Sequence, residues 1–180
     1  MARRQASAGR RGAARLSRAA RRPRRRRRPA ARRSLSADFL EVVVHSLAEA
    51  HAALHAARDL NARIALRSAP DAGHYAGALF FRKIVEALEA EFGTSLEWVF
   101  WFDCGEDAGL ALNALRHGLT HLCGRTGAQT DRRLANIARR MGAAYRRETA
   151  RSRRPALDLI DEPEPYDAVR RVLEGAERGR

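Results

Sequence analysis

The chain has 180 residues and a formal net charge of +14, from 35 Lys and Arg against 21 Asp and Glu. All of that excess lies in residues 1–37, which hold fifteen arginines and no acidic side chain, so the remainder is close to neutral. No apolar stretch approaches the roughly 20 residues that span a bilayer, and residues 38–180 are too few for two separate cores. We expect one domain over residues 38–180, no membrane partner and a basic extension before it.

The extension over residues 1–37 contains the segment RRPRRRRRPAARR, in which like charges repel and two prolines oppose a helix. We expect it to be disordered when free. Three interpretations stay open: sequence-blind binding to nucleic acid through counterion release, a targeting segment, and a start codon placed too far upstream.

The first elements follow the extension. Ser46 and Glu49 form a capping box ahead of a helix expected over residues 47–60. The apolar run ARIAL predicts a buried strand that ends at Ser68, in front of the turn-rich segment SAPDAG. A second amphipathic helix is expected over residues 78–92, with Gly93 after its last turn.

The next elements repeat this order. LEWVFWFDCG is typical of a strand covered on both faces, and Glu106 and Asp107 favour a helix start after it. LTHLC predicts another strand, followed by the loop GRTGAQT and a helix that includes Leu134 and Met141. ALDLI and residues 166–175 are interpreted as a last strand and a last helix.

Strands that alternate with helices over short connections predict a parallel sheet with right-handed crossovers. The fold class expected is α/β with four or five strands, arranged as a half or truncated TIM-type (β/α) barrel. An open doubly wound sheet fits the order too, although the glycine fingerprint of dinucleotide folds is missing. Because a half barrel leaves sheet edges open, we expect self-association.

Four segments, ARIALRSAPDAGHYAG, FFRKIVEALEAEF, WVFWFDCGEDAGLALNALRHGLTHL and LANIARRMGAAY, occur in an order and spacing that resemble the second to fourth βα units of class II fructose-bisphosphate aldolases. The resemblance covers about residues 47–145. Its most specific part is FDCG at a strand end, where the family has Leu-Asp-His-Gly.

Members of that family cleave a ketose bisphosphate with a zinc ion that polarises the ketone. The resemblance implies that Asp103 is the catalytic acid, that Cys104 stands at the first metal ligand, and that Ser68 contacts substrate. The Arg125 loop adds a candidate phosphate site. Without the resemblance, Asp103 is interpreted as a turn carboxylate and Cys104 as a small buried side chain.

The departures from the family decide the functional prediction. The chain ends before the strands that carry the two further histidine ligands, whereas catalytic zinc needs three protein ligands. We therefore expect a degenerate aldolase-like domain, non-catalytic or dependent on a partner, which binds a sugar phosphate and no metal. The alternatives are a residual zinc-dependent aldehyde-lyase and a nucleic-acid-associated protein that acts through residues 1–37.

Other candidates are weaker. His51 and His55 lie one helical turn apart and can share a metal, but no third ligand is assignable, so a solvated helix face is favoured. His74 and Tyr75 are expected beside Asp103 as pocket walls. Cys104 and Cys123 lie in apolar runs, which favours free thiols in a reducing cytoplasm.

Overall fold

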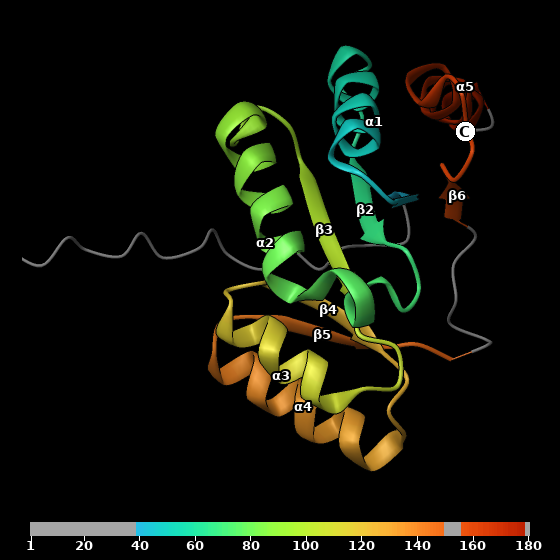
Figure 1. Ribbon diagram of the computed structural model, residues 1–180. Helices are drawn as coiled ribbons and strands as arrows, with labels where there is room; N and C mark the ends of the chain where they lie inside the picture. The colour runs from blue at the N-terminus through green and yellow to red at the C-terminus, as the bar shows by residue number, and fades with distance from the viewer. Residues whose placement is uncertain (1–38, 150–155, 179–180) are drawn as a thin grey trace, which may run out of the picture. The chain divides into compact units, whose positions relative to one another are not determined.

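The structure, a computed structural model, describes residues 39–149 and 156–178, which form an α/β fold of six strands and five helices (Figure 1). The extension over residues 1–37 lies outside the described residues, so the structure does not test the expectations about it. The strands are β1 (Leu40–Val44), β2 (Ile64–Ser68), β3 (Trp98–Asp103), β4 (His121–Gly124), β5 (Ala144–Arg147) and β6 (Ala156–Asp158). The helices are α1 (Leu47–Asp59), α2 (Ala72–Phe92), α3 (Ala108–Arg116), α4 (Ala128–Arg140) and α5 (Pro165–Arg178).

The six strands form one sheet in the order β5-β4-β3-β2-β1-β6, and every neighbouring pair is parallel. The predicted parallel sheet is confirmed. The expected number of four or five strands is wrong, because β1 and β5 were not foreseen. β5 has the sequence AYRR, which shows no strand pattern by itself and becomes a strand by pairing with β4.

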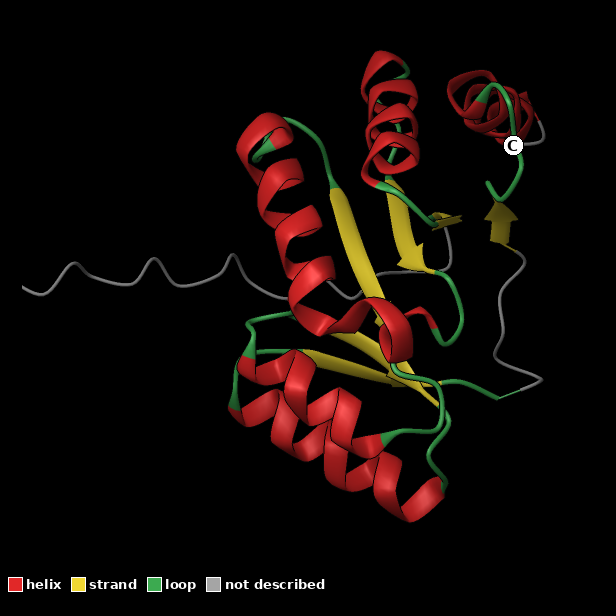
Figure 2. Ribbon diagram, viewed as in Figure 1, coloured by secondary structure: helices red, strands yellow, loops and turns green. Residues whose placement is uncertain are grey.

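The helices form one series of neighbours, in the order α5, α1, α2, α3 and α4 (Figure 2). Alternate strand residues, such as Leu66, Phe102 and Leu122, pack with helix residues in the larger hydrophobic cluster. The intervening residues, such as Ala65, Val99 and Trp101, form a second cluster in which no described helix takes part. We call the side of the sheet that carries this second cluster the inner face.

Helix starts follow the capping residues that the sequence provides. The Ser46 hydroxyl accepts a hydrogen bond from the Glu49 backbone N–H, so Ser46 is confirmed as the N-cap of α1. The Glu49 carboxylate accepts from the His45 N–H, one residue before the donor that the predicted capping box uses. Asp107 caps α3 in the same way, through Gly109 and Leu110. The helix expected from Ala78 has an extra turn before it, because α2 begins at Ala72 and bends at Gly77, whose φ of 76° is strained for other residues.

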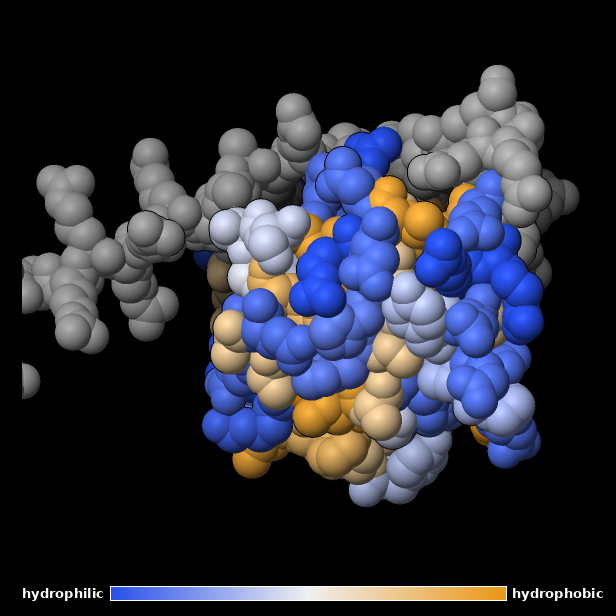
Figure 3. All heavy atoms as spheres, turned by 90° about the horizontal axis from the view of Figure 1, so that it is seen from above, coloured by the Kyte–Doolittle hydropathy of each residue, from blue (hydrophilic) through white to orange (hydrophobic). Residues whose placement is uncertain are grey.

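One face of the domain exposes mainly polar side chains (Figure 3). Seen from above, hydrophilic residues cover most of the face in view, and hydrophobic residues gather in smaller areas (Figure 3). Among the described helices, none combines the length and the apolar character that crossing a membrane requires. Cys104 and Cys123 are both buried and free, as predicted.

Candidate functional site

Charged side chains occupy the inner face, and those of β2, β3 and β5 lie near the carboxyl-terminal ends of the strands, the edge at which parallel α/β sheets bind ligands. Glu41 reaches them from near the amino-terminal end of β1. Side chains alternate between the two faces along a strand, so Arg67 on β2 and Asp103 on β3 lie on the face of Trp101. We call four of the residues on this face the ionic cluster. They are Glu41, Arg67, Arg146 and Glu148.

The ionic cluster satisfies its own charges. Arg67 Nη1 lies 3.0 Å from Glu41 Oε1 and 3.2 Å from Glu148 Oε1. Arg146 donates to the same two carboxylates, at 3.0 Å to Glu41 Oε2 and 2.7 Å to Glu148 Oε1. Burial lowers the pKa of Arg146, but the hydrogen bond to Glu41 and the charge of Glu41 outweigh it and leave this pKa above its ordinary value. The two guanidinium groups and two carboxylates therefore neutralise one another.

Asp103 ends β3 and is almost fully buried, with 1% of its surface exposed. Its Oδ1 accepts a hydrogen bond of 2.7 Å from the Gly105 backbone N–H. Burial raises the pKa of the carboxyl group and the Glu148 charge adds to the effect, whereas Gly105, Arg67 and Arg125 oppose it. A carboxyl group with a raised pKa is suited to donate a proton.

Ser68 and Cys104, the other residues named from the aldolase resemblance, are held inside the protein. The Ser68 hydroxyl accepts a hydrogen bond of 2.9 Å from the Asp103 backbone N–H, which fixes the end of β3 against β2. Cys104 belongs to the cluster packed against the helices, and burial raises the pKa of its thiol. The structure brings Ser68 to Asp103 but places the Cys104 sulfur on the other side of the sheet.

Arg125 begins the loop after β4 and is surrounded by carboxylates. Its guanidinium lies 3.5 Å from both Asp71 and Glu106 and 3.9 Å from Asp103. The side chain is 37% exposed, so solvent weakens these pairs. Three nearby negative charges make the surroundings of Arg125 unfavourable for a phosphate.

Cys123 is the residue that sequence reasoning missed. It pairs in register with Asp103, and its sulfur lies within 4.8 Å of carboxylate oxygens of Asp103 and Glu148, in a spacing that can hold a metal ion. Burial raises the pKa of this thiol well above its ordinary value. The signal available in the sequence was its place as the last residue of the predicted strand LTHLC, since the ends of neighbouring parallel strands meet at one edge of a sheet.

A concavity lies between α4 and β5. A hollow of about 240 Å³ is lined by Asp131, Arg132, Tyr145 and Arg147, together with two alanines of α4. Buried Asp131 accepts hydrogen bonds from the Thr126 hydroxyl at 2.9 Å and the Tyr145 hydroxyl at 2.7 Å. Arg147 Nε lies 3.1 Å from Asp131 Oδ2, as an ion pair without hydrogen-bond alignment. We call this hollow the α4 pocket.

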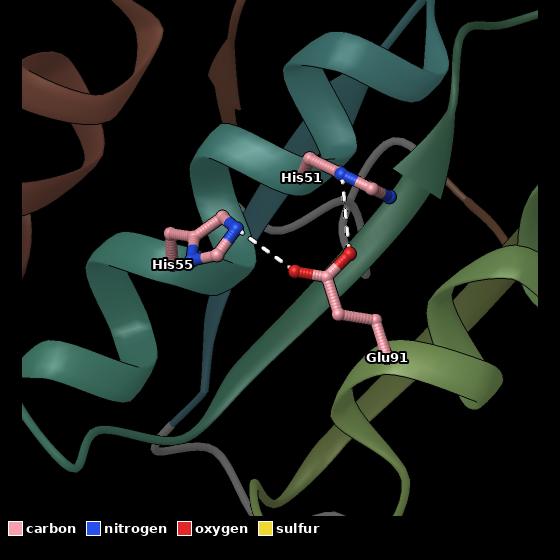
Figure 4. Close-up of side chains that lie close together, drawn as sticks. All are labelled: His51, His55 and Glu91. Carbon is pink, nitrogen blue, oxygen red and sulfur yellow. Dashed lines mark ion pairs between the residues drawn. The ribbon is translucent and has the colours of Figure 1, made fainter.

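The remaining histidine candidates lie elsewhere. His74 is near the Asp107 carboxylate, at 3.9 Å, and Tyr75 is 78% exposed, so neither encloses Asp103. His51 and His55 lie on α1 beside Glu91 of α2, which supplies the third ligand type that the sequence did not reveal (Figure 4).

Comparison of the chain with protein-family profiles and with curated proteins found no match. The resemblance to class II aldolases therefore rests on the quoted segments and on the order of strands and helices.

Proposed function

We propose that this chain is a degenerate, non-catalytic relative of the class II aldolases that binds a sugar phosphate. The proposal that the domain is non-catalytic depends on the side chains at the end of β3, which point alternately to the two faces of the sheet. Asp103 faces Cys123 and Glu148, whereas Cys104 packs among helix residues on the opposite side. A zinc ion held by Cys104 would therefore be separated from the acid with which it has to act.

The order of the strands and their parallel direction support the relation to a barrel. Strands β1 to β5 follow one another in sequence order, and the last strand, β6, pairs in parallel with β1. In a closed (β/α)8 barrel the last strand pairs with the first in the same way. We propose that the domain is a shortened barrel, whose open edges are β5 and β6.

We assign binding of the phosphoryl group of the sugar phosphate to the α4 pocket and not to Arg125. Arg132 and Arg147 carry two positive charges in its lining against one negative charge on Asp131. The first turn of α4 lies at the same place, and its N-cap, Gly127, offers no side chain to satisfy the free N–H groups. Ligand pockets usually measure about 300–1,000 Å³, so the hollow suits the phosphoryl end of a ligand.

Calorimetric titration with fructose 1,6-bisphosphate tests the binding, with fructose and inorganic phosphate as comparisons. We expect the bisphosphate to bind and Arg132→Gln to weaken its binding at least about tenfold, since a charge-assisted hydrogen bond contributes about 1.5–3 kcal/mol. Arg139→Gln, on the exposed last turn of the same helix, is the matched control and should leave the affinity unchanged. Equal binding of fructose and its bisphosphate, or equal effects of both substitutions, would contradict the assignment.

A residual zinc-dependent lyase is the second candidate, favoured by the spacing of Asp103, Cys123 and Glu148. Against it, Glu148 already accepts hydrogen bonds from Arg67 and Arg146, whose positive charges repel a cation. Retro-aldol cleavage of fructose 1,6-bisphosphate, measured with and without a chelator, distinguishes the candidates. Chelator-sensitive turnover that disappears in Cys123→Ser would establish the lyase and overturn the non-catalytic proposal.

A further inference from the structure

A histidine pair and a carboxylate meet between α1 and α2, away from the carboxyl-terminal ends of the strands. His51 and His55 project from neighbouring turns of α1 toward Glu91, in the last turn of α2 (Figure 4). His51 Nδ1 lies 3.4 Å from Glu91 Oε2, and His55 Nε2 lies 3.0 Å from Glu91 Oε1. The three ligand atoms all lie within 4.8 Å of one another.

These separations are close to those in the coordination shell of a small transition-metal ion. Metal–ligand distances of about 2.0–2.1 Å place the ligands of a tetrahedral site about 3.3 Å apart. The two histidine–glutamate distances, 3.4 and 3.0 Å, are near this value but end on different oxygens of Glu91, so small shifts must bring the three ligand atoms from within 4.8 Å to the ion. Histidines at positions i and i+4 of a helix present their rings on one side, as in zinc enzymes. Imidazole and carboxylate together suit zinc, cobalt and nickel.

The site is held by its surroundings and is open to solvent. The Phe92 ring contacts both imidazoles edge to face, with centroids 6.0 Å from His51 and 5.0 Å from His55. About a third of each ligand side chain is exposed, at 34% for His51, 35% for His55 and 38% for Glu91. An ion therefore has access from solvent, and water can complete its shell.

The two nitrogens of His51 differ in their surroundings, since Nδ1 faces Glu91. Its Nε2 is buried and has no hydrogen-bond partner among the described residues. The 3.4 Å contact of its Nδ1 with Glu91 is long for a hydrogen bond, so His51 loses little when a metal ion takes that contact. By contrast, every carboxylate of the ionic cluster already accepts short hydrogen bonds from arginine.

One neighbour competes with a metal. Arg58 Nη2 lies 2.9 Å from His55 Nδ1, and a histidine that binds metal through Nε2 carries its proton on Nδ1. Arg58 must then turn away, which its exposed position and its neighbour Asp59, 3.6 Å from its Nε, allow. Removal of Arg58 should therefore favour the metal.

We infer that His51, His55 and Glu91 form a binding site for a divalent transition-metal ion of the zinc class, which ties α1 to α2. The site lies in the helix layer, shares no residue with the α4 pocket and does not include Asp103. It is therefore independent of the proposed function.

Calorimetry with ZnCl₂ and absorption spectroscopy with CoCl₂ test the site on the untagged full chain. We expect one strong site, a visible cobalt band typical of tetrahedral coordination, and a rise in Tm with zinc that a chelator reverses. His51→Ala, His55→Ala and Glu91→Gln should each weaken zinc binding at least about tenfold. Loss of a residue that only hydrogen-bonds a metal ligand already lowers metal affinity about 10–100-fold. Arg58→Ala should strengthen it.

His117→Ala is the matched control, because this exposed histidine ends α3 and lies outside the cluster. We expect it to bind zinc as the unaltered chain does. Absence of zinc binding would overturn the inference, and so would binding that survives in the His51→Ala/His55→Ala double variant or is lost equally in His117→Ala. Circular dichroism of each variant checks that α1 and α2 remain folded.

Discussion

The Arg67 guanidinium on β2 donates to the Glu148 carboxylate just after β5, at 3.2 Å, across 81 residues of sequence. Both side chains are buried, with 3% and 8% of their surface exposed. The contact crosses the inner face, because β3 and β4 lie between β2 and β5 in the sheet order. Arg146 donates to the same carboxylate at 2.7 Å, and its guanidinium carbon lies 4.5 Å from the centroid of the Trp101 ring.

Replacing Arg67 by methionine should strongly destabilise the domain. The change leaves Glu41 and Glu148 with Arg146 as their remaining cation, and breaking a buried ion pair from one side costs about 3–5 kcal/mol. The free energy of unfolding in urea measures the effect. Arg116→Met, at the exposed end of α3, is the control and should change little; equal effects would show that the ionic cluster contributes nothing specific.

Asp103→Asn should stabilise the domain at neutral pH. Because burial raises the folded-state pKa of this carboxyl above its unfolded value, ionised Asp103 opposes folding at pH values above that raised pKa. The penalty disappears as pH falls below the ordinary pKa range of aspartate, where both states are protonated. Urea unfolding at pH 7 and at low pH should therefore give a gain at pH 7 alone. A gain of the same size at both pH values would contradict this explanation, since asparagine still accepts the Gly105 hydrogen bond.

Gly73→Ala should destabilise α2. A Cβ atom there would come within 2.6 Å of a Leu110 methyl group and 2.7 Å of the Phe102 ring, and such overpacking costs about 1–3 kcal/mol. Gly175→Ala is the matched substitution, with open space around it on α5, and should stabilise by up to about 1 kcal/mol through helix propensity. Thermal unfolding of both variants checks the opposite signs.

The domain should associate with itself. Strands β5 and β6 end the sheet order, and an edge strand presents unpaired backbone groups that can accept another strand. Sedimentation velocity over a range of concentrations should show dimers or larger species that increase with concentration. A monomer throughout that range would contradict the prediction.

The arginine-rich residues 1–37 should confer salt-dependent binding to nucleic acid. Cationic side chains release counterions from phosphates, so the affinity should fall steeply as salt rises and should not depend on base sequence. Fluorescence anisotropy with labelled duplex DNA measures this, with a chain that lacks residues 1–37 as the comparison. Undiminished binding by the shortened chain would place the interaction in the domain.

Most of the fold could be predicted because its signals are local. The capping residues Ser46 and Asp107, the glycine after α2 and the apolar run of β3 each act within a few residues, and they located three helices and the central strand. β5 could not be found in this way, since its residues Ala144–Arg147 become a strand only when β4 supplies hydrogen bonds.

The sequence by itself determined an α/β domain with a parallel sheet and a polar residue, Asp103, at the end of its central strand. Only the tertiary structure decided which side chains surround that residue. Faces alternate along β3, so Cys104 turned to the helices, and sheet pairing brought Cys123 and Glu148 to Asp103. The same holds for Glu91, which helix packing places beside His51 and His55. Contacts between residues far apart in the chain depend on register and packing, which no local pattern encodes.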